Sequence, residues 1–500
     1  MIAKNKNNDK SLKQINKKSL KQINKKSFTT IDAVVEEFVN ITNLLPSHGF
    51  KKRNGHSPIS IFKALFYQAF YGSSNLFRFA DSDHFKNFDI SSHAAYRLLN
   101  NERVNWSKLL LSVGEKAIRE LVKCNKVTHI NALVIDDTPY ERAKAKNVEG
   151  ASSTFDHVSG RNIIGNHILQ IGYTDGFSYI PLVNRMVASK HIIGEIRTDI
   201  DHRTYGGKIR RDLQRTKPEL VVKGCKSIVA NEIPVSHVLM DSWFYSEDLI
   251  NQLQGLGLES IIRLKSNITF SDANTGELPT NLKTFYRRAS EVQIPGSKGL
   301  IKEINVLTKS GKEMKLVFVP NISMQPNKND KNNFIGIISS DLSLSAEQIT
   351  TLYLRRWSIE TNFRIEKQFL GLGKECQAQN FDPINAFVNL SSLRYIVLEI
   401  MRRLQIDGKS LGLIFMDQAE YLQEKTFVDA IRLIKSMLEE LPKEIEKNVF
   451  GWVEKIVAKN PKTKISQREY DELSNGIYKT FEKAINGTFQ FISNLFGTEV

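Results

Sequence analysis

Carboxylates stand at positions where they could act together on one substrate. The apolar stretch NALVIDD ends in Asp136 and Asp137, SHVLMDSWF contains Asp241, and Glu360 lies within YLRRWSIETNFRIEKQF, residues 353–369. Strand ends can meet at one edge of a sheet, and a packed helix can bring a further acid there. Hard divalent cations such as Mg²⁺ prefer oxygen ligands, and two of them can hold both oxygens of a phosphoryl displacement. These residue types therefore favour metal-assisted phosphoryl chemistry.

Each of these acids also has a structural interpretation. Asp136 and Asp137 precede Thr138 and Pro139, a turn-compatible run, and Asp241 is followed by a serine. The spacing alone does not choose between Asp136 and Asp137 as the chemical residue. Glu360 has an arginine four residues away on either side, and helix ion pairs of this kind contribute only about 0.3–0.5 kcal/mol.

The residues around Glu360 favour the chemical interpretation. At about 100° per residue, Tyr353, Arg356, Glu360 and Lys367 fall within an arc of roughly 60° on one predicted helix. An apolar stripe beside this arc must face a core; it consists of Leu352, Ile359, Phe363 and Leu370. Glu366, beyond that stripe, is predicted to be a solvated acid. A metal-binding carboxylate flanked by phosphate-binding Tyr, Arg and Lys explains the whole arc, whereas a salt bridge explains two of its residues.

The elements that position these acids alternate between strand and helix patterns. Residues 131–267 read as short apolar strands interrupted by helices, with a hairpin turn at Thr174-Asp175-Gly176. Residues 268–345 contain β-type runs between turns, and helix returns at about Ser345 and continues through residues 353–369. This order predicts a mixed α/β sheet followed by a β-rich insertion and a long helix.

The charge balance indicates a polyanionic partner. The 500 residues include 70 Lys and Arg against 54 Asp and Glu, a net charge of +16, which suits nucleic acid or an anionic membrane surface. No run of about 18 apolar residues and no signal-peptide pattern is found, so we expect no membrane association. The cysteines are widely spaced, as in proteins of a reducing cytosol without disulfides or a Cys-based zinc site; they are Cys124, Cys225 and Cys376.

The first part of the chain is basic. Residues 1–27 contain the octad SLKQINKK twice and are predicted to form a basic disordered tail, with a phosphate-tracking arm as the alternative. Residues 28–128 show helical periodicity. They are predicted to form a helical, DNA-binding domain, although a packed helical cap explains the pattern about as well.

A family resemblance rests on these motifs. Tyr353-x2-Arg356-x3-Glu360-x6-Lys367 resembles the Y-R-E-K signature of insertion-sequence transposases of the "insertion sequence four" type, within the DDE class. VIDDT resembles the family's first-Asp motif, in which the catalytic Asp directly precedes Thr, and VLMDSWF resembles its second-Asp motif. The resemblance covers about residues 130–375 and includes the β-rich insertion.

The resemblance implies a fold and a reaction. Residues 129–267 and 346–378 would form a ribonuclease H-like core, residues 268–345 the insertion, and residues 379–500 a helical C-terminal region. The catalytic acids would be Asp137, Asp241 and Glu360, binding two magnesium ions, with manganese as a substitute. The enzyme would cleave at transposon ends and join the freed 3′-hydroxyl to target DNA.

The resemblance also implies partners and DNA contacts. Tyr353, Arg356 and Lys367 would contact DNA near the reacting phosphate, and Trp357, just outside their arc, is a candidate DNA contact. Terminal inverted-repeat DNA and target DNA would be the partners of a homodimer in the bacterial cytoplasm, associated with the nucleoid. A ribonuclease H-like nuclease without strand transfer and an inactive DNA-binding relative are the alternatives.

One family trait is missing from the predicted insertion. Some relatives stack a flipped base on a tryptophan of this region, but residues 268–345 contain no Trp. Phe285, Tyr286 or the neighbouring Trp243 would have to serve instead.

Overall fold

The computed structural model describes residues 29–51, 54–73, 75–123, 130–142, 147–156, 160–273, 279–293, 301–320, 334–404 and 408–439. The predicted tail at residues 1–27 lies outside these ranges, as do residues 440–500 of the predicted C-terminal region. The chain divides into two compact units, residues 1–415 and 416–500, and the features discussed below belong to the first.

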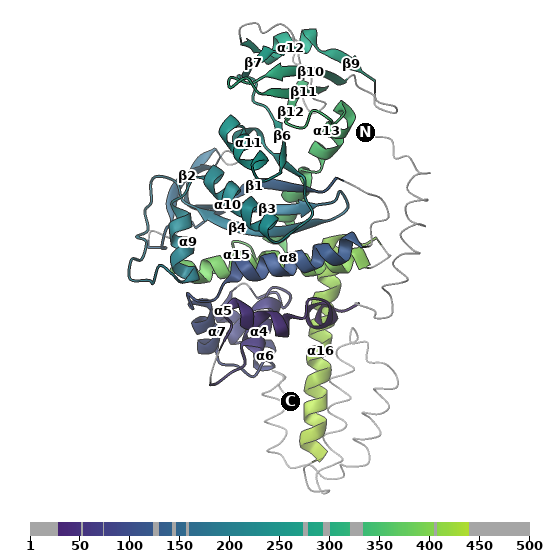
Figure 1. Ribbon diagram of the computed structural model, residues 1–500. Helices are drawn as coiled ribbons and strands as arrows, with labels where there is room; N and C mark the ends of the chain where they lie inside the picture. Colours follow the sequence, from purple (N-terminus) through teal and green to yellow (C-terminus); the bar gives the residue numbers. More distant parts are fainter. Residues whose placement is uncertain are drawn as a thin grey trace. The chain divides into compact units, whose positions relative to one another are not determined.

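A mixed β-sheet runs through the first unit (Figure 1). Its core strands are β1 (Ala132–Glu141), β2 (Ser152–Asp156), β3 (Arg161–Thr174), β4 (Tyr179–Val187), β5 (His237–Met240) and β6 (Glu259–Arg263). β3 pairs antiparallel with β1, β2 and β4, while β1, β5 and β6 pair in parallel. The predicted α/β class is confirmed, and the sheet with its flanking helices is consistent with a ribonuclease H-like core.

The predicted hairpin is also confirmed. β3 ends at Thr174 and β4 begins at Tyr179, and the connecting Gly176 has a positive φ of 91°. This left-handed conformation favours glycine, which explains the Asp-Gly turn signal.

Strands in the range of the predicted insertion extend the same sheet. They are β7 (Thr269–Asp272), β8 (Thr280–Asn281), β9 (Ser290–Val292), β10 (Ile301–Leu307), β11 (Glu313–Pro320) and β12 (Phe334–Ser339), with α12 (Leu282–Arg288) beside them. β12 pairs antiparallel with β6, so the insertion continues the core sheet at its edge. The described residues form twelve strands in all.

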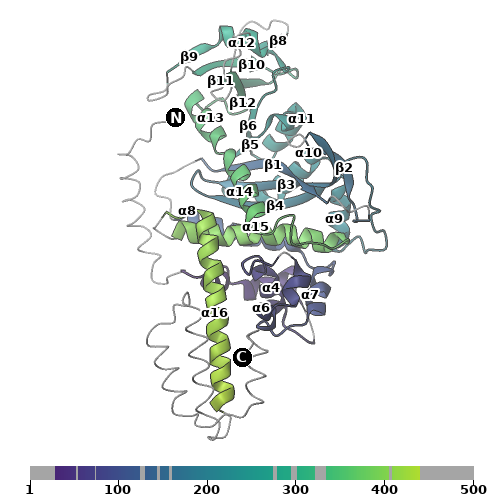
Figure 2. The same cartoon turned by 180° about the vertical axis from the view of Figure 1, so that it is seen from behind.

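Helices cover both faces of the core sheet (Figures 1 and 2). α8 (Trp106–Val122), α14 (Trp357–Gln368) and α15 (Phe381–Leu404) lie on one face; α9 (Tyr205–Leu213) and α10 (Lys217–Ala230) lie on the other, with α11 (Glu247–Gln254) beside α10. The packing is close at two glycines. A Cβ on Gly114 of α8 would lie 2.5 Å from Leu182, and one on Gly224 of α10 would lie 2.5 Å from Ile171.

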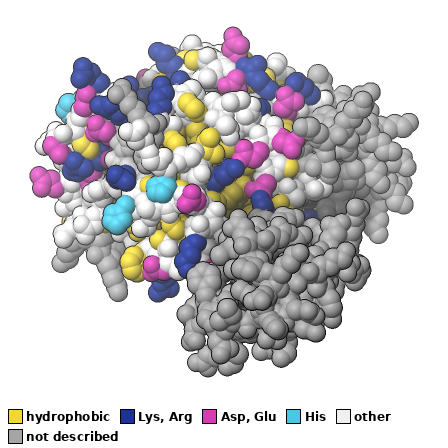
Figure 3. Space-filling model, turned by 90° about the horizontal axis from the view of Figure 1, so that it is seen from below, with side chains coloured by type: hydrophobic (Ala, Val, Ile, Leu, Met, Phe, Trp, Pro, Cys, Tyr) yellow, Lys and Arg dark blue, Asp and Glu magenta, His cyan; other side chains and the backbone are white. Residues whose placement is uncertain are grey.

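The described part of residues 28–128 is helical, as the periodicity predicts. Before α8 it contains α2 (Ile31–Ala33), the π-helix η1 (Val34–Phe38), α3 (Ile41–Leu44), the 3₁₀-helix η2 (Leu45–His48), α4 (Pro58–Tyr67), α5 (Leu76–Ala80), α6 (Asp83–Lys86) and α7 (Ser92–Leu99). Viewed from below (Figure 3), the described surface carries Lys and Arg interspersed with Asp and Glu. Charge on this face therefore does not outline one DNA-binding surface, and the DNA-binding role remains a prediction.

The stretch 353–369 is not the single helix that the periodicity predicts. α13 (Ala346–Leu354) ends before Arg355, and α14 begins at Trp357. Between them the amide groups of Arg355 and Arg356 donate to carbonyls three residues back, as in a 3₁₀ turn. A tighter turn changes the angle per residue, so an arc calculated from Tyr353 cannot be carried unchanged into α14.

α15 is the core helix of the first unit. Among the described residues, only this helix has the length and hydropathy to span a membrane, and its apolar window is completely buried inside the protein. Arg394, near its middle, is fully buried and bonds to Glu375 at 2.6 Å. The burial of this helix is that of a packing element inside a globular unit.

Candidate active site

The structure places Asp136 beside Asp241. β1 continues past Asp136 and Asp137 to Glu141, so the predicted strand end at these two acids is wrong, whereas β5 ends at Met240, directly before Asp241. β1 and β5 are parallel, and Ile135 pairs with Met240, so the two acids are the next residues on neighbouring strands. Burial raises the pKa of Asp136 to about 6, and the negative charge of Asp241 adds to this effect. Two carboxylates in such proximity form an acidic centre that a cation would stabilise.

Arg356 links this acidic centre to the helix that carries Glu360. Its Nη1 lies 3.0 Å from Asp136 Oδ2, and its Nη2 lies 2.5 Å from Glu360 Oε1. The arginine side chain is 12% exposed and the glutamate side chain 34% exposed, so Glu360 is the more accessible of the two. The Arg356–Glu360 salt bridge considered from the sequence is therefore present. The same guanidinium also pairs with Asp136, so Arg356 connects two acids.

Asp137 points to the opposite face of the sheet. Its Oδ2 accepts a hydrogen bond from His167 Nδ1 at 2.5 Å and lies 2.8 Å from the ammonium of Lys217. Burial alone would raise the pKa of Asp137, but these two partners hold it below its ordinary value. The structure therefore does not group Asp137 with Asp241 and Glu360.

Lys367 and Tyr353 lie on the side of Asp136. Lys367 Nζ donates to Thr138 Oγ1 at 2.6 Å, and because side chains alternate along a strand, Thr138 shares the face of Asp136. Burial lowers the pKa of Lys367 and raises that of Tyr353. The buried Tyr353 hydroxyl makes no hydrogen bond of good geometry with the described residues, although Asp241 and Arg356 lie near enough to influence it.

Two tryptophans are exposed near this centre. Trp357 is 64% exposed at the start of α14, and Trp243, two residues after Asp241, is 50% exposed. Lys217 Nζ lies 4.7 Å from the Trp243 ring centroid, so this lysine joins Asp137 of β1 to the segment that follows β5. Trp357 has the accessibility that a DNA contact needs.

The aromatic residues suggested within the insertion are less accessible. Phe285 is completely buried, which rules it out as a stacking surface in this structure. The Tyr286 ring stacks on Phe334 with centroids 4.5 Å apart, and Lys302 lies 4.9 Å from its centroid. Trp243 is therefore the most accessible of the three suggested alternatives.

Two protein-family models match parts of the chain. Residues 85–281 match the DDE superfamily endonuclease model, and residues 212–393 match the transposase DDE domain model. These segments are therefore similar to DDE endonuclease and transposase domains. No curated protein matches it. The matched segments include Asp136, Asp241 and Glu360, and DDE transposase domains generally use divalent metal ions.

The acids of the candidate site can be tested for their fit to a divalent cation. No three carboxylate, imidazole or thiol groups among the described residues form a ready cluster around one point. Mg²⁺ usually takes only one or two protein carboxylates and completes its shell with water and substrate phosphate. The adjacent Asp136 and Asp241 meet that requirement, and Glu360 reaches the same centre through Arg356.

The interpretation of Glu366 as a solvated acid is wrong. It is 1% exposed, and the Ser392 hydroxyl of α15 donates to its Oε1 at 2.6 Å. Burial raises the pKa of Glu366 to about 7. α14 lies between the sheet and α15, so two sides of this helix are buried. The single apolar stripe in the sequence predicts only one buried side.

Sequence reasoning did not single out His167 and Lys217, the two partners of Asp137. His167 lies within β3, and Lys217 is the first residue of α10, a position that the capping box of Thr216 and Glu219 makes recognisable. That helix start could have been found from the sequence, but its contact with Asp137 depends on how α10 packs across the sheet.

Proposed function

We propose that this protein is a DNA transposase of the Y-R-E-K type that cleaves DNA at the ends of its element and joins the 3′-hydroxyl to target DNA. The observation that carries the proposal is the acidic centre of Asp136 and Asp241, connected through Arg356 to Glu360. The match to the transposase DDE domain supports the same class of reaction.

Asp136 replaces Asp137 as the first catalytic acid in this proposal. The register of β1 and β5 supports Asp136 because it is the neighbour of Asp241. The amide of Asp137 donates to Asp136 Oδ1 at 2.8 Å and so orients that carboxylate. Asp137 itself is bonded to His167 and Lys217, which suits a residue that positions β1.

Asp136, Asp241 and Glu360 would hold two divalent cations, magnesium by preference and manganese as a substitute. When bound, such ions stabilise the attacking and leaving oxygens of an in-line displacement. Arg356 would exchange its carboxylate partners for a DNA phosphate, because a guanidinium binds either group in a fork geometry. Lys367 and Tyr353 would hold the same phosphate by charge and hydrogen bond, and Trp357 would contact DNA at the entrance.

The partners follow from the reaction. The element's terminal inverted repeats and the target DNA would be the substrates, bound by a homodimer that pairs the two ends. The net charge of +16 supports a polyanionic substrate and an operating place on the bacterial nucleoid in the cytoplasm. The helical segment 28–128 would contribute DNA binding outside the DDE domain.

The test uses DNA from both flanks of the coding region. Purified protein is incubated with this DNA and Mg²⁺, and cleavage is followed on a sequencing gel; pre-cut ends with a target plasmid then report joining. We expect metal-dependent cleavage and joining, both lost in Glu360→Gln. Cleavage without joined product would indicate a nuclease, and DNA binding without cleavage would indicate an inactive relative. Glu360→Gln that cleaves like the wild type would refute the site assignment.

A further inference from the structure

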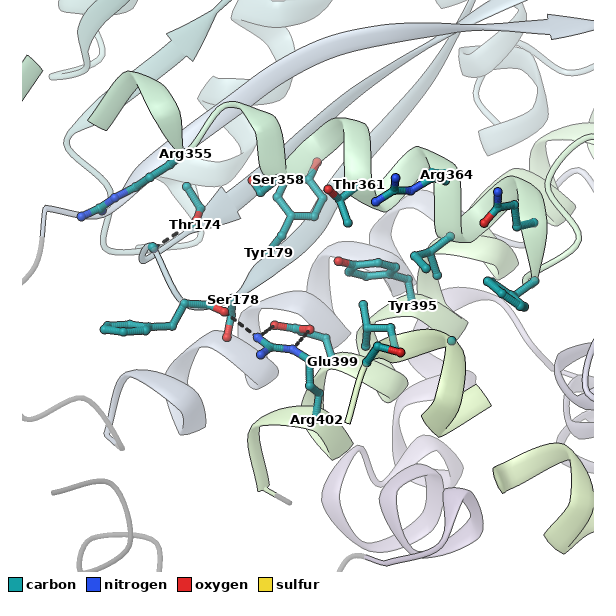
Figure 4. A pocket seen from close by; sticks show the side chains of 18 of the residues that line it. Thr174, Ser178, Tyr179, Arg355, Ser358, Thr361, Arg364, Tyr395, Glu399 and Arg402 are labelled. Atoms are coloured by element: carbon teal, nitrogen blue, oxygen red, sulfur yellow. Dashed lines mark hydrogen bonds and ion pairs between the residues drawn. The ribbon is translucent and has the colours of Figure 1, made fainter. Parts of the chain in front are cut away.

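A groove lies on the side of α14 opposite the acids (Figure 4). Its volume is about 720 Å³, and its walls are the β3–β4 turn, α14, the second half of α15 and the start of α16 (Leu411–Glu439). Ser358 and Thr361 of α14 line it, whereas Glu360 and Lys367 of the same helix are directed to β1. The groove is thus separate from the acidic centre but shares a helix with it.

The lining of this groove is positively charged. Arg355 and Arg364 contribute guanidinium groups from one wall, and Arg402 contributes a third from α15. The acid of the lining, Glu399, is bonded by Arg402 through two contacts of 2.5 and 2.7 Å. Neither Arg355 nor Arg364 forms an ion pair with any residue that the structure describes. Arg355 Nη1 donates to the carbonyl of Ile130 at 2.7 Å, so the rest of its guanidinium and that of Arg364 can bind an anion.

The spacing of these arginines suits an extended ligand better than a single phosphate. Arg355 lies in the turn before α14, and Arg364 lies seven residues after Trp357, the first residue of that helix, a rise of roughly 10 Å. Figure 4 shows them toward opposite ends of the groove, with Arg402 on the facing wall. Charges distributed in this way match a chain that carries one negative charge on each unit.

Hydrogen-bonding groups and aromatic rings lie between the arginines. The Ser358 hydroxyl is buried and makes no hydrogen bond with the described residues, and Tyr395 also lines the groove. Phe177 of the β3–β4 turn lines the groove with 41% of its side chain exposed, and Phe369 lines the far end of α14. Proteins that bind single strands combine a basic groove with rings on which bases stack.

We propose that this groove binds an unpaired strand of DNA. Phosphates would lie against Arg355 and Arg364, and bases would stack on Phe177 or Phe369. A duplex presents phosphates on a convex surface and keeps its bases inside, so only an unpaired strand brings both to a concave groove. The inference rests on the proposed function for its choice of DNA, and it places a single strand on the helix that carries Glu360.

Binding is tested without metal, in EDTA, by fluorescence anisotropy of a labelled oligothymidylate with the full-length protein. Arg364→Glu changes an exposed residue that forms no ion pair within the described part of the chain, so we expect it to fold. Lys226→Glu, an exposed residue of α10 on the other face of the sheet, is the matched control. We expect at least about a tenfold loss of affinity in Arg364→Glu, a similar loss in Arg355→Ala, and less than a twofold change in the control.

The location is tested by crosslinking an oligonucleotide that contains 5-iododeoxyuridine, followed by mass spectrometry. We expect crosslinked peptides that contain Phe177 or Phe369, and their loss in Arg364→Glu. Crosslinks confined to other peptides, or equal losses in Arg364→Glu and Lys226→Glu, would overturn the proposal. Displacement by thymidine monophosphate as readily as by the oligonucleotide would also overturn it, because the groove would then be a single-phosphate site.

The result of the strand-binding assay does not depend on catalysis. The binding assay contains no metal and uses no terminal repeat, so it can succeed when the cleavage assay fails. Metal-dependent cleavage together with unchanged strand binding in Arg364→Glu would sustain the proposed function and reject the groove.

Discussion

Replacing Asp136 and Asp137 separately should move stability in opposite directions. The pKa of Asp136 is about 6 against an ordinary 3.8, and each unit of pKa corresponds to about 1.4 kcal/mol. The ionised carboxylate therefore destabilises the fold by up to about 3 kcal/mol at neutral pH. Asp136→Asn removes this charge, and we expect a gain of about 1–3 kcal/mol, part of it offset by the lost bond to Arg356.

Asp137→Asn should have the opposite effect. Its carboxylate is bonded to His167 and Lys217, and both its side chain and that of Lys217 are nearly buried, with 15% and 16% exposed. Neutralising the acid leaves the lysine without its counter-charge, and we expect a loss of about 1–3 kcal/mol.

The dependence of stability on pH shows whether the ionised Asp136 stabilises or destabilises the fold. A carboxyl group whose pKa is raised by folding destabilises the protein once it ionises. This destabilisation grows as the pH rises from about 4 to about 6 and is complete above that range. Thermal unfolding of the wild type and both variants between pH 4 and pH 8 measures it. We expect the gain in Asp136→Asn to appear only in the upper part of this range.

The two substitutions should also differ in their effect on DNA cleavage. Asp136→Asn should lower metal-dependent cleavage by about 10³-fold or more, equivalent to about 4 kcal/mol in the barrier. Asp137→Asn should lower it by about 10- to 100-fold, as expected when a group that orients a ligand is changed. Full cleavage by Asp136→Asn together with none by Asp137→Asn would refute the assignment of roles.

Three further perturbations test the packing around the site. Glu366→Gln removes a buried acid whose pKa is raised to about 7, so the unfolding temperature of this variant should fall less than that of the wild type as the pH rises from about 5 to 8. Arg394→Met leaves the buried Glu375 without its partner and should lower the free energy of unfolding, measured in urea, by about 3–5 kcal/mol. The control Arg119→Met breaks an exposed pair with Glu115 and should lower this free energy by less than about 1 kcal/mol. Lys217→Ala should lower cleavage by about 10- to 100-fold and change the fluorescence of Trp243, and unchanged values for both would show that this lysine does not position β1.

The sequence predicted the elements of the site better than their contacts. β1 runs through Asp136 and Asp137 to Glu141 rather than ending there, but the strand end before Asp241 and the hairpin turn at Gly176 follow from local patterns and are present in the structure. These features depend on residues close together in the chain, such as caps and turn formers.

Local sequence patterns do not show whether Asp136 or Asp137 is the neighbour of Asp241. A strand covered on one face alternates polar and apolar residues, but β1 is covered on both, and Ala132 to Ile135 are all completely buried. Only the parallel register with β5, set by residues more than 100 positions away, shows which acid neighbours Asp241.

The break between α13 and α14 and the burial of Glu366 also could not be predicted from local helical periodicity. Helical periodicity predicts one apolar side, but α14 contacts both the sheet and α15. The second contact buries Glu366 against Ser392, which lies 26 positions further along the chain. Such burial depends on tertiary packing, which a single helical pattern does not contain.

Binding of the divalent cation by the proposed carboxylates can be measured by changing the chemistry of one ligand. Asp241→Cys offers a thiolate, which suits softer metals than magnesium. We predict that this variant cleaves terminal-repeat DNA at less than about a hundredth of the wild-type rate in Mg²⁺ and recovers at least tenfold when Mn²⁺ replaces it. Wild-type cleavage in Mg²⁺ by Asp241→Cys would show that Asp241 does not bind the metal ion.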